Sequence, residues 1–364
     1  MKKLLLALLL LFLCAGGAAA VDVSGEQSAQ FGLPALEDGV PDSAASLLPD
    51  STPLSPGALG DGVQNILNGS LPEASGALRG ALRTAGAVLA VVVLCAMVTQ
   101  MEGKYSADAV RIAGVLGIMA ICAAGVQSMV GQGQQAIDEL QSFSQLLLPA
   151  VAAATAAGGG AVSASALYAA SALVCSVLTT VIDRLLLPLV YAFLAVSAAD
   201  AVLGNQALTR LRTLVKWVAS WSLKAAVYLF TAYLGLTRVV SGTADAAAVR
   251  AAKLAVSTAV PVVGGMISDA SETVLLGAQT IRNSAGVFGL LAVLAICAVP
   301  LVKMGVPYLV MKLTAAVSGP LGDKRLTEVV SSVSEAMGLL TGMTGACGFL
   351  VLMSCVCSIR AVSV

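Results

Sequence analysis

The sequence contains no histidine and few charged or aromatic residues. Without histidine the chain cannot build a Ser-His-Asp or Cys-His catalytic arrangement, an HExxH zinc site or a haem-histidine ligand. It also contains no GxxxxGK[ST] loop, which excludes nucleotide binding through that motif. We therefore expect a protein that is not an enzyme and carries no cofactor. Any energy-driven function would need a partner to supply the energy.

Charge is scarce along the whole chain. Charged residues make up 11% of it, hydrophobic residues 58%, and the mean hydropathy is +0.93. Soluble domains are about a quarter charged, so a soluble fold of this composition would have little polar surface to present to water. The formal net charge is zero, and no basic surface for nucleic acid is visible in the sequence. The composition predicts a protein whose main solvent is a lipid bilayer.

The cysteines offer no site of their own. Cys14 falls in the N-terminal apolar run, and the other seven fall inside later apolar runs. Free cysteines in such positions behave as small buried hydrophobic residues. The extracytoplasmic stretch described below has none, so we expect no metal site and no structural role for disulfides.

The N-terminus has the pattern of an export signal. Lys2 and Lys3 precede a short apolar run at 4–13, and Ala18, Ala19 and Ala20 form an A-x-A cleavage site. The apolar run is too short to span a membrane, so residues 1–20 are predicted to be a cleaved signal peptide. A lipoprotein signal acylated at Cys14 is the alternative, but it would require a small residue where Leu13 stands.

Residues 21–84 are predicted to be extracytoplasmic. From 21 to 78 the segment carries acidic residues and no lysine or arginine, which favours translocation. Five prolines between 34 and 56 indicate an extended first half. Apolar residues at helical spacing from Leu59 to Leu67 predict a short amphipathic helix before Pro72, and residues 77–83 predict another on the membrane surface.

Residues 85–364 are predicted to form an all-α polytopic transmembrane helical bundle, because they contain repeated apolar runs near the length of a bilayer span. About seven to nine membrane segments are expected, since 146–162 and 259–278 are short or interrupted and 259–278 could be re-entrant instead. The candidate segments are 86–101, 112–130, 146–162, 163–182, 185–203, 217–239, 259–278, 286–311 and 337–359.

The charge bias predicts an orientation. With residue 21 onward outside, the first span runs inward, and the loop carrying Lys104 and Arg111 is cytoplasmic. A loop at 131–145 with acidic residues alone is then expected outside, and 205–216, with three basic residues, is expected inside.

Three ionisable residues lie inside apolar segments: Asp200, Lys224 and Lys303. A charge in lipid is costly, so each is a candidate functional residue lining a polar path. The structural alternative is that the lysines extend to the membrane surface and that Asp200 pairs with Lys224 in the next helix. Separately, Gly338 and Gly342 form a GxxxG pattern, which predicts close helix packing near the C-terminus.

Several motifs resemble one family. The stretch 256–270 reads VSTAVPVVGGMISDA, 283–289 reads NSAGVFG, 319–325 reads GPLGDKR, and 185–200 reads LLLPLVYAFLAVSAAD. These stretches resemble the stage III sporulation protein AE family, and the resemblance is densest between about 185 and 330.

The resemblance implies a function rather than a catalytic site. It implies a multi-pass component of a secretion-like channel complex between mother cell and forespore, required for endospore development after engulfment. The implied location is the mother-cell membrane that engulfs the forespore. The implied partners are ring-forming proteins and an ATPase of the same operon and, indirectly, a forespore membrane protein. The alternative is a stand-alone secondary transporter or permease, which the lack of convincing similarity between the two halves of the chain disfavours.

One segment of the resemblance is unusual for a helix that faces lipid. Pro261, Gly264 and Gly265 would interrupt a helix, and Asp269 and Glu272 would be costly in lipid. Irregular backbone at membrane depth is tolerated where it lines a cavity or is buried in protein. We therefore expect these five residues to line or gate the passage of the assembly, the alternative being a surface or hinge segment needed only for folding.

Overall fold

The computed structural model describes residues 39–48, 58–101, 104–157, 160–259, 264–321 and 323–359. The signal peptide and residues 21–38 expected from the sequence lie outside these ranges. The described residues are helical apart from short turns. The elements in order are α4 (Asp42–Ala45), α5 (Ala58–Met101), α6 (Lys104–Ala157), α7 (Ala161–Val181), a π-helical turn (Ile182–Leu186), α8 (Leu187–Leu203), α9 (Gln206–Ala259), α10 (Gly264–Leu321) and α11 (Lys324–Ile359).

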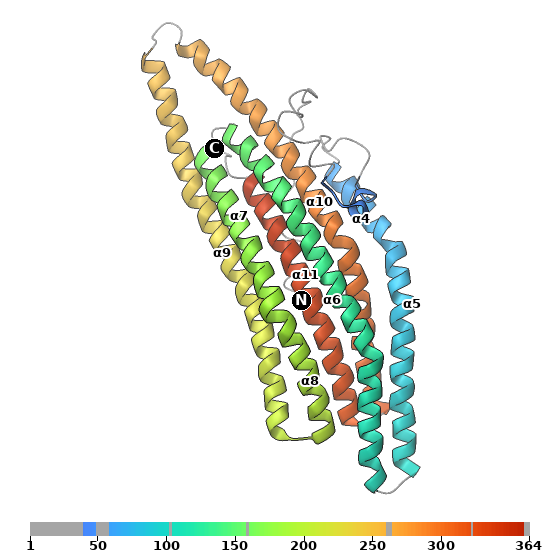
Figure 1. The fold of residues 1–364 in the computed structure, drawn as a ribbon. Helices are drawn as coiled ribbons and strands as arrows, with labels where there is room; N and C mark the ends of the chain where they lie inside the picture. The colour runs from blue at the N-terminus through green and yellow to red at the C-terminus, as the bar shows by residue number, and fades with distance from the viewer. Residues whose placement is uncertain are drawn as a thin grey trace.

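The long helices form one elongated bundle in which successive rods run in opposite directions (Figure 1). The connections that follow α5, α8 and α10 lie at the lower end of the view, and those that follow α6 and α9 lie at the upper end. At the lower end Arg111 Nη2 donates a hydrogen bond to the carbonyl of Val202, with a separation of 3.3 Å. Lys104, Arg111 and the basic segment 205–216 are therefore at the same end of the bundle.

The turn between α8 and α9 depends on a glycine. Gly204 adopts φ 64°, a left-handed conformation that favours glycine, and its N–H donates to the Asp200 carbonyl over 2.8 Å. The side-chain oxygen of Asn205 accepts a hydrogen bond from the N–H of Ala207 over 3.0 Å and caps the first turn of α9. This tight turn fixes the antiparallel register of α8 and α9.

A proline explains the π-helical turn between α7 and α8. Pro188 has no N–H to donate to the carbonyl four residues earlier, so the chain cannot keep a regular α-helical pattern there. The N–H of Leu187 instead bonds the carbonyl of Ile182, five residues back. The axis continues, and 161–203 form one rod (Figure 1).

Five of the described helical stretches are long and apolar enough to cross a membrane: Gly62–Thr99, Asp108–Ala156, Ala161–Leu203, Gly286–Leu321 and Lys324–Cys357. Their lengths run from 34 to 49 residues, whereas a bilayer requires about 20. The expected span at 217–239 lies inside α9 and is not among the five. The all-helical fold predicted from composition is confirmed for the described residues, and five of its helical stretches are of membrane-spanning length.

The expected boundaries between neighbouring spans do not all coincide with helix ends. The expected outside loop at 131–145 is a continuous part of α6, which joins the predicted spans 112–130 and 146–162. The polar residues there occupy one face, where Gln135 Nε2 bonds Glu139 Oε1 over 2.9 Å. Ile137 and Leu140 are buried on the other face. The segment is amphipathic, so its polarity does not end the helix.

Segments predicted to be separate are also continuous before and after α6. The predicted helix before Pro72, the surface helix at 77–83 and the span at 86–101 all form one helix, α5, with Pro72 inside it. The spans at 163–182 and 185–203 are joined by the π-helical turn. The segment 259–278 contains the end of α9 and the start of α10, and its residues 260–263 lie outside the described ranges.

Glycines allow α11 to pack closely on its neighbours. A Cβ added at Gly338 would lie 2.7 Å from Cε2 of Tyr308 in α10, and one added at Gly342 would lie 3.5 Å from a methyl group of Leu223 in α9. The chain therefore uses both glycines in internal packing, where small residues let helix backbones approach.

We expect Gly338→Ala to destabilise the bundle more than Gly345→Ala in the same helix. The added methyl group at Gly338 collides with the Tyr308 ring, whereas at Gly345 it would meet Leu301 at an ordinary 3.6 Å. Overpacking of this kind costs roughly 1–3 kcal/mol. Thermal unfolding midpoints of the purified variants in one detergent would check this, and equal midpoints would contradict the packing described.

Candidate functional site

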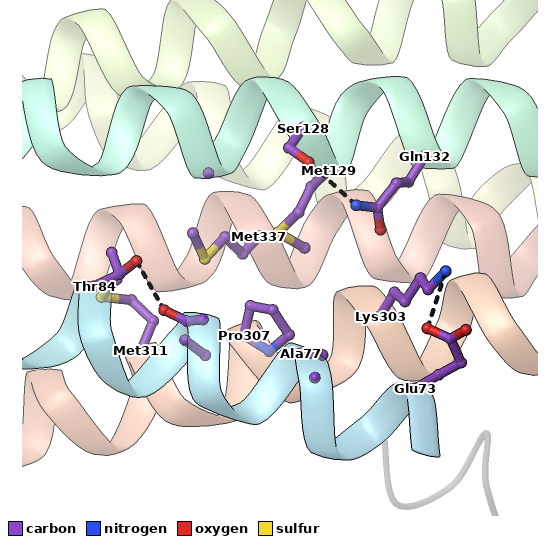
Figure 2. A pocket seen from close by; sticks show the side chains of 14 residues that line it. Glu73, Ala77, Thr84, Ser128, Met129, Gln132, Lys303, Pro307, Met311 and Met337 are labelled. Atoms are coloured by element: carbon purple, nitrogen blue, oxygen red, sulfur yellow. Dashed lines mark hydrogen bonds and ion pairs between the residues drawn. The ribbon is translucent and has the colours of Figure 1, made fainter. Parts of the chain in front are cut away.

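A pocket of about 450 Å³, open to the surface, lies between α5, α6, α10 and α11 (Figure 2). Most of its wall is apolar or small, with a few polar groups, which is the usual composition of a binding cleft. It is lined by Glu73, Gly76, Ala77, Gly80, Ala81 and Thr84 of α5, by Gly125, Ser128, Met129 and Gln132 of α6, by Lys303, Pro307 and Met311 of α10, and by Met337 of α11.

An ion pair closes one end of this pocket. Lys303 Nζ lies 3.1 Å from Glu73 Oε2, and the two side chains are 38% and 45% exposed (Figure 2). Pro307 follows Lys303 by one helical turn and has no N–H, so the Lys303 carbonyl lacks its usual helical donor. Lys303, a candidate residue from the sequence, thus joins α10 to α5 and lines the pocket, with Glu73 as a partner that sequence analysis missed.

The α6 wall of the pocket contributes an amide. Gln132 Nε2 donates to Ser128 Oγ over 3.1 Å, while Gln132 Oε1 is buried and accepts no hydrogen bond within the described part of the chain. The flexible side chains of Met129, Met311 and Met337 complete the wall (Figure 2). Methionine is common at surfaces that adapt to a partner. These groups can bind polar and apolar parts of another molecule, and they contain no activated nucleophile.

A second group of charged side chains connects three helices at the lower end of the bundle. Asp200, whose side chain is 4% exposed, lies 3.4 Å from Arg212 and accepts a 2.7 Å hydrogen bond from Thr209 Oγ1. Arg212 also lies 3.5 Å from Glu328 of α11. One turn farther along α9, Lys216 Nζ is 2.6 Å from Glu335 Oε1. The network links α8, α9 and α11.

The predicted pair of Asp200 with Lys224 is therefore corrected. The tight turn at Gly204 brings Asp200 opposite the first two turns of α9, and Lys224 lies roughly 18 Å beyond Arg212 at the α-helical rise. Lys224 is exposed on α9. On the same helix Trp217 and Trp221 are also exposed and stack with their ring centroids 5.9 Å apart.

The segment expected from the sequence to line the passage lies only partly within the described residues. Pro261 lies outside the described residues. Gly264, Gly265, Asp269 and Glu272 belong to the first turns of α10, which begins at Gly264 after α9 ends at Ala259. The α9–α10 hairpin projects beyond the other helices at the upper end of Figure 1, away from the pocket and from Asp200.

Comparison with known families supports the resemblance seen in the motifs. A family model described as stage III sporulation protein AE matches residues 52–361, which covers all six of the long rods. The chain belongs to the stage III sporulation protein AE family. Membership of this family, together with several apolar helices long enough to span a bilayer, makes the chain a multi-pass stage III sporulation membrane protein.

One curated member of the family shows how far the sequences have diverged. The stage III sporulation protein AE of Bacillus subtilis (strain 168) is 22% identical over 256 residues, covering 69% of this chain and 64% of the relative. The match thus spans less than two thirds of that protein's length. No solved structure matches the chain.

Arg212→Gln should destabilise this family member, whereas Lys224→Gln should not. The first change leaves Asp200 buried without its cationic partner, which costs on the order of 3 kcal/mol. The second removes an exposed amine, and the structure gives Asp200 other partners. Thermal unfolding midpoints in detergent would separate the two variants by several degrees. A larger effect of Lys224→Gln would restore the original pairing hypothesis.

Proposed function

We propose that this protein is the multi-pass membrane component of a secretion-like channel complex between mother cell and forespore, located in the mother-cell membrane that engulfs the forespore. It would act with ring-forming proteins and an ATPase of the same operon and, indirectly, with a forespore membrane protein. The observation that carries the proposal is the family match over residues 52–361 of a chain with five membrane-length apolar helices.

The character of the pocket suits a subunit of an assembly. The pocket contains a half-exposed ion pair and an amide oxygen that receives no hydrogen bond from the described residues, and most of the remaining lining is small or apolar. Polar groups among apolar helices favour a role in function or in partner contacts, because such groups are costly in lipid.

The orientation also supports the proposal. The connections carrying Lys104 and 205–216 lie at one end of the bundle (Figure 1), and positive charge favours the cytoplasmic side. The upper end, with the projecting α9–α10 hairpin, would then face the intermembrane space, where partners from the forespore would be met. In that orientation α11 ends on the outer side.

The proposal is tested first by timing and location in the native host. A fluorescent protein that matures outside the cytoplasm, fused after residue 364, is expected to be absent during growth and to mark the engulfing membrane once engulfment begins. A strain lacking the gene is expected to arrest after engulfment, and the fusion should restore spores. Steady expression in growing cells, with normal sporulation of the deletion strain, would favour the transporter alternative.

We further propose that the segment of Pro261, Gly264, Gly265, Asp269 and Glu272 lines or gates the passage of that complex. Ser268→Cys and Ser271→Cys would then react with a membrane-impermeant thiol reagent in sporulating cells. The unsubstituted chain is the control for reaction at the natural cysteines, of which Cys95 and Cys175 are partly exposed and the others in the described residues are buried. Lack of reaction at both positions in the assembled complex would count against a water-lined passage.

A further inference from the structure

Exposed basic side chains lie along the middle of α5, α9 and α10. Arg79 and Arg83 belong to α5, Lys224 to α9 and Lys312 to α10, and each is exposed. Within the described ranges no ion pair includes any of them. An unpaired charge surrounded by hydrocarbon is costly, so this part of the bundle is unsuited to the centre of a bilayer.

The cations of α5 and α10 lie at one level of the bundle. Glu73 of α5 pairs with Lys303 of α10, and the two helices run in the same direction from that contact (Figure 1). At the α-helical rise Arg83 lies roughly 15 Å farther along α5, and Lys312 lies roughly 14 Å farther along α10. Arg79 lies about one turn before Arg83. These three cations therefore occupy a narrow band.

The N-terminal half of α9 reaches the same band. Lys216 pairs with a glutamate of α11 that lies about one turn before Gly338, and Gly338 faces the ring of Tyr308 in α10. Tyr308 is followed one turn later by Lys312. Trp217, next to Lys216, is therefore roughly level with Lys312. Because α5 and α9 lie on opposite sides of the bundle, the band includes more than one of its faces (Figure 1).

Both tryptophans of the chain lie on the exposed face of α9 in or beside this band. Trp217 is 62% exposed, Trp221 is 58% exposed, and their rings stack. Lys224 follows on the same face, and helical side chains lean toward the N-terminus, so it can extend back toward the two rings. Tryptophan is enriched where hydrocarbon meets the lipid headgroups, because its ring is apolar and its N–H is polar.

Large apolar side chains are exposed beside the cations. Leu82 precedes Arg83 and is 55% exposed, and Leu313 follows Lys312 and is 67% exposed. Such residues are unsuited to bulk water, just as unpaired cations are unsuited to hydrocarbon. The boundary between the two accommodates both, since a long basic side chain can keep its stem in the apolar layer and its charge among the headgroups.

We propose that these exposed basic and aromatic residues form a belt that binds the anionic headgroups of a lipid leaflet. The belt consists of Arg79, Arg83, Trp217, Trp221, Lys224 and Lys312. Its charges are all positive, which is complementary to anionic rather than zwitterionic lipid. The membrane surface then crosses the bundle at mid-length, and part of each rod lies outside the hydrocarbon. This follows from the surface of the chain alone and does not rest on the proposed channel function.

Tryptophan fluorescence of the natural chain tests the depth of the belt. The chain has no tryptophan outside the belt, so the signal reports on Trp217 and Trp221 alone. The full chain is reconstituted in phosphatidylcholine vesicles that carry a nitroxide quencher either on the headgroup or near the end of the acyl chain. We expect stronger quenching from the headgroup position. Stronger quenching from the chain end overturns the proposal, and so does quenching by aqueous iodide with none from either lipid.

The lipid preference is tested with brominated phosphatidylglycerol and brominated phosphatidylcholine as alternative quenchers. The natural chain should prefer the anionic lipid, and Lys224→Gln should weaken that preference about fivefold, the contribution of one basic side chain at an anionic surface. Lys324→Gln is the matched control, because Lys324 is exposed at the start of α11, outside the belt.

The control variant makes the lipid measurement specific to the belt. Equal quenching of the natural chain by the two brominated lipids overturns the proposal, because headgroup charge then plays no part. An equal loss of preference in both variants overturns it too, because the effect would then come from the overall charge of the chain. Thermal unfolding midpoints equal to that of the natural chain show that neither substitution acts through folding.

Discussion

The constraint on which this structure depends is that a backbone surrounded by lipid must satisfy its own hydrogen bonds. A loop at membrane depth would leave peptide groups unpaired, so the chain continues as helix through sequences that would end a helix in water. Pro72, Pro149 and Pro300 all lie inside long helices. At Pro188 the chain shifts to an i to i−5 hydrogen bond instead of breaking. The long rods follow directly from this requirement.

Once the helices are continuous, their association needs contacts other than the hydrophobic effect, because lipid is as apolar as their side chains. The structure uses two kinds. Glycines of α11 bring its backbone close to Tyr308 and Leu223. Charged and polar side chains at the lower end connect α8, α9 and α11 through Asp200, Arg212 and Glu328. The buried carboxylate is stable there because a hydroxyl and a guanidinium both satisfy it.

Composition was sufficient to predict an all-helical membrane protein, because scarce charge and long apolar runs leave no other solvent. The helix ends were not predictable by the same means. Residues 131–145 look like a loop because they are polar, yet their apolar residues recur at helical spacing and are buried on one side. The partner of Asp200 depends on the register set by the left-handed Gly204, and the meeting of Glu73 with Lys303 joins helices distant in sequence. No pattern in the neighbouring sequence indicates either contact.

The long helices extend well beyond the thickness of one bilayer. The longest of the five membrane-length helices, 49 residues, extends roughly 70 Å at the α-helical rise, more than twice the hydrocarbon thickness of a membrane. Large apolar side chains are exposed over much of that length, from Leu67 and Leu71 near one end of α5 to Leu94 and Met97 near the other. One bilayer cannot surround the whole of such a helix, so part of it extends into the aqueous phase or contacts other protein. Apolar side chains that lie beyond the hydrocarbon layer would be removed from water by contact with another protein, which agrees with the proposed role in a membrane assembly.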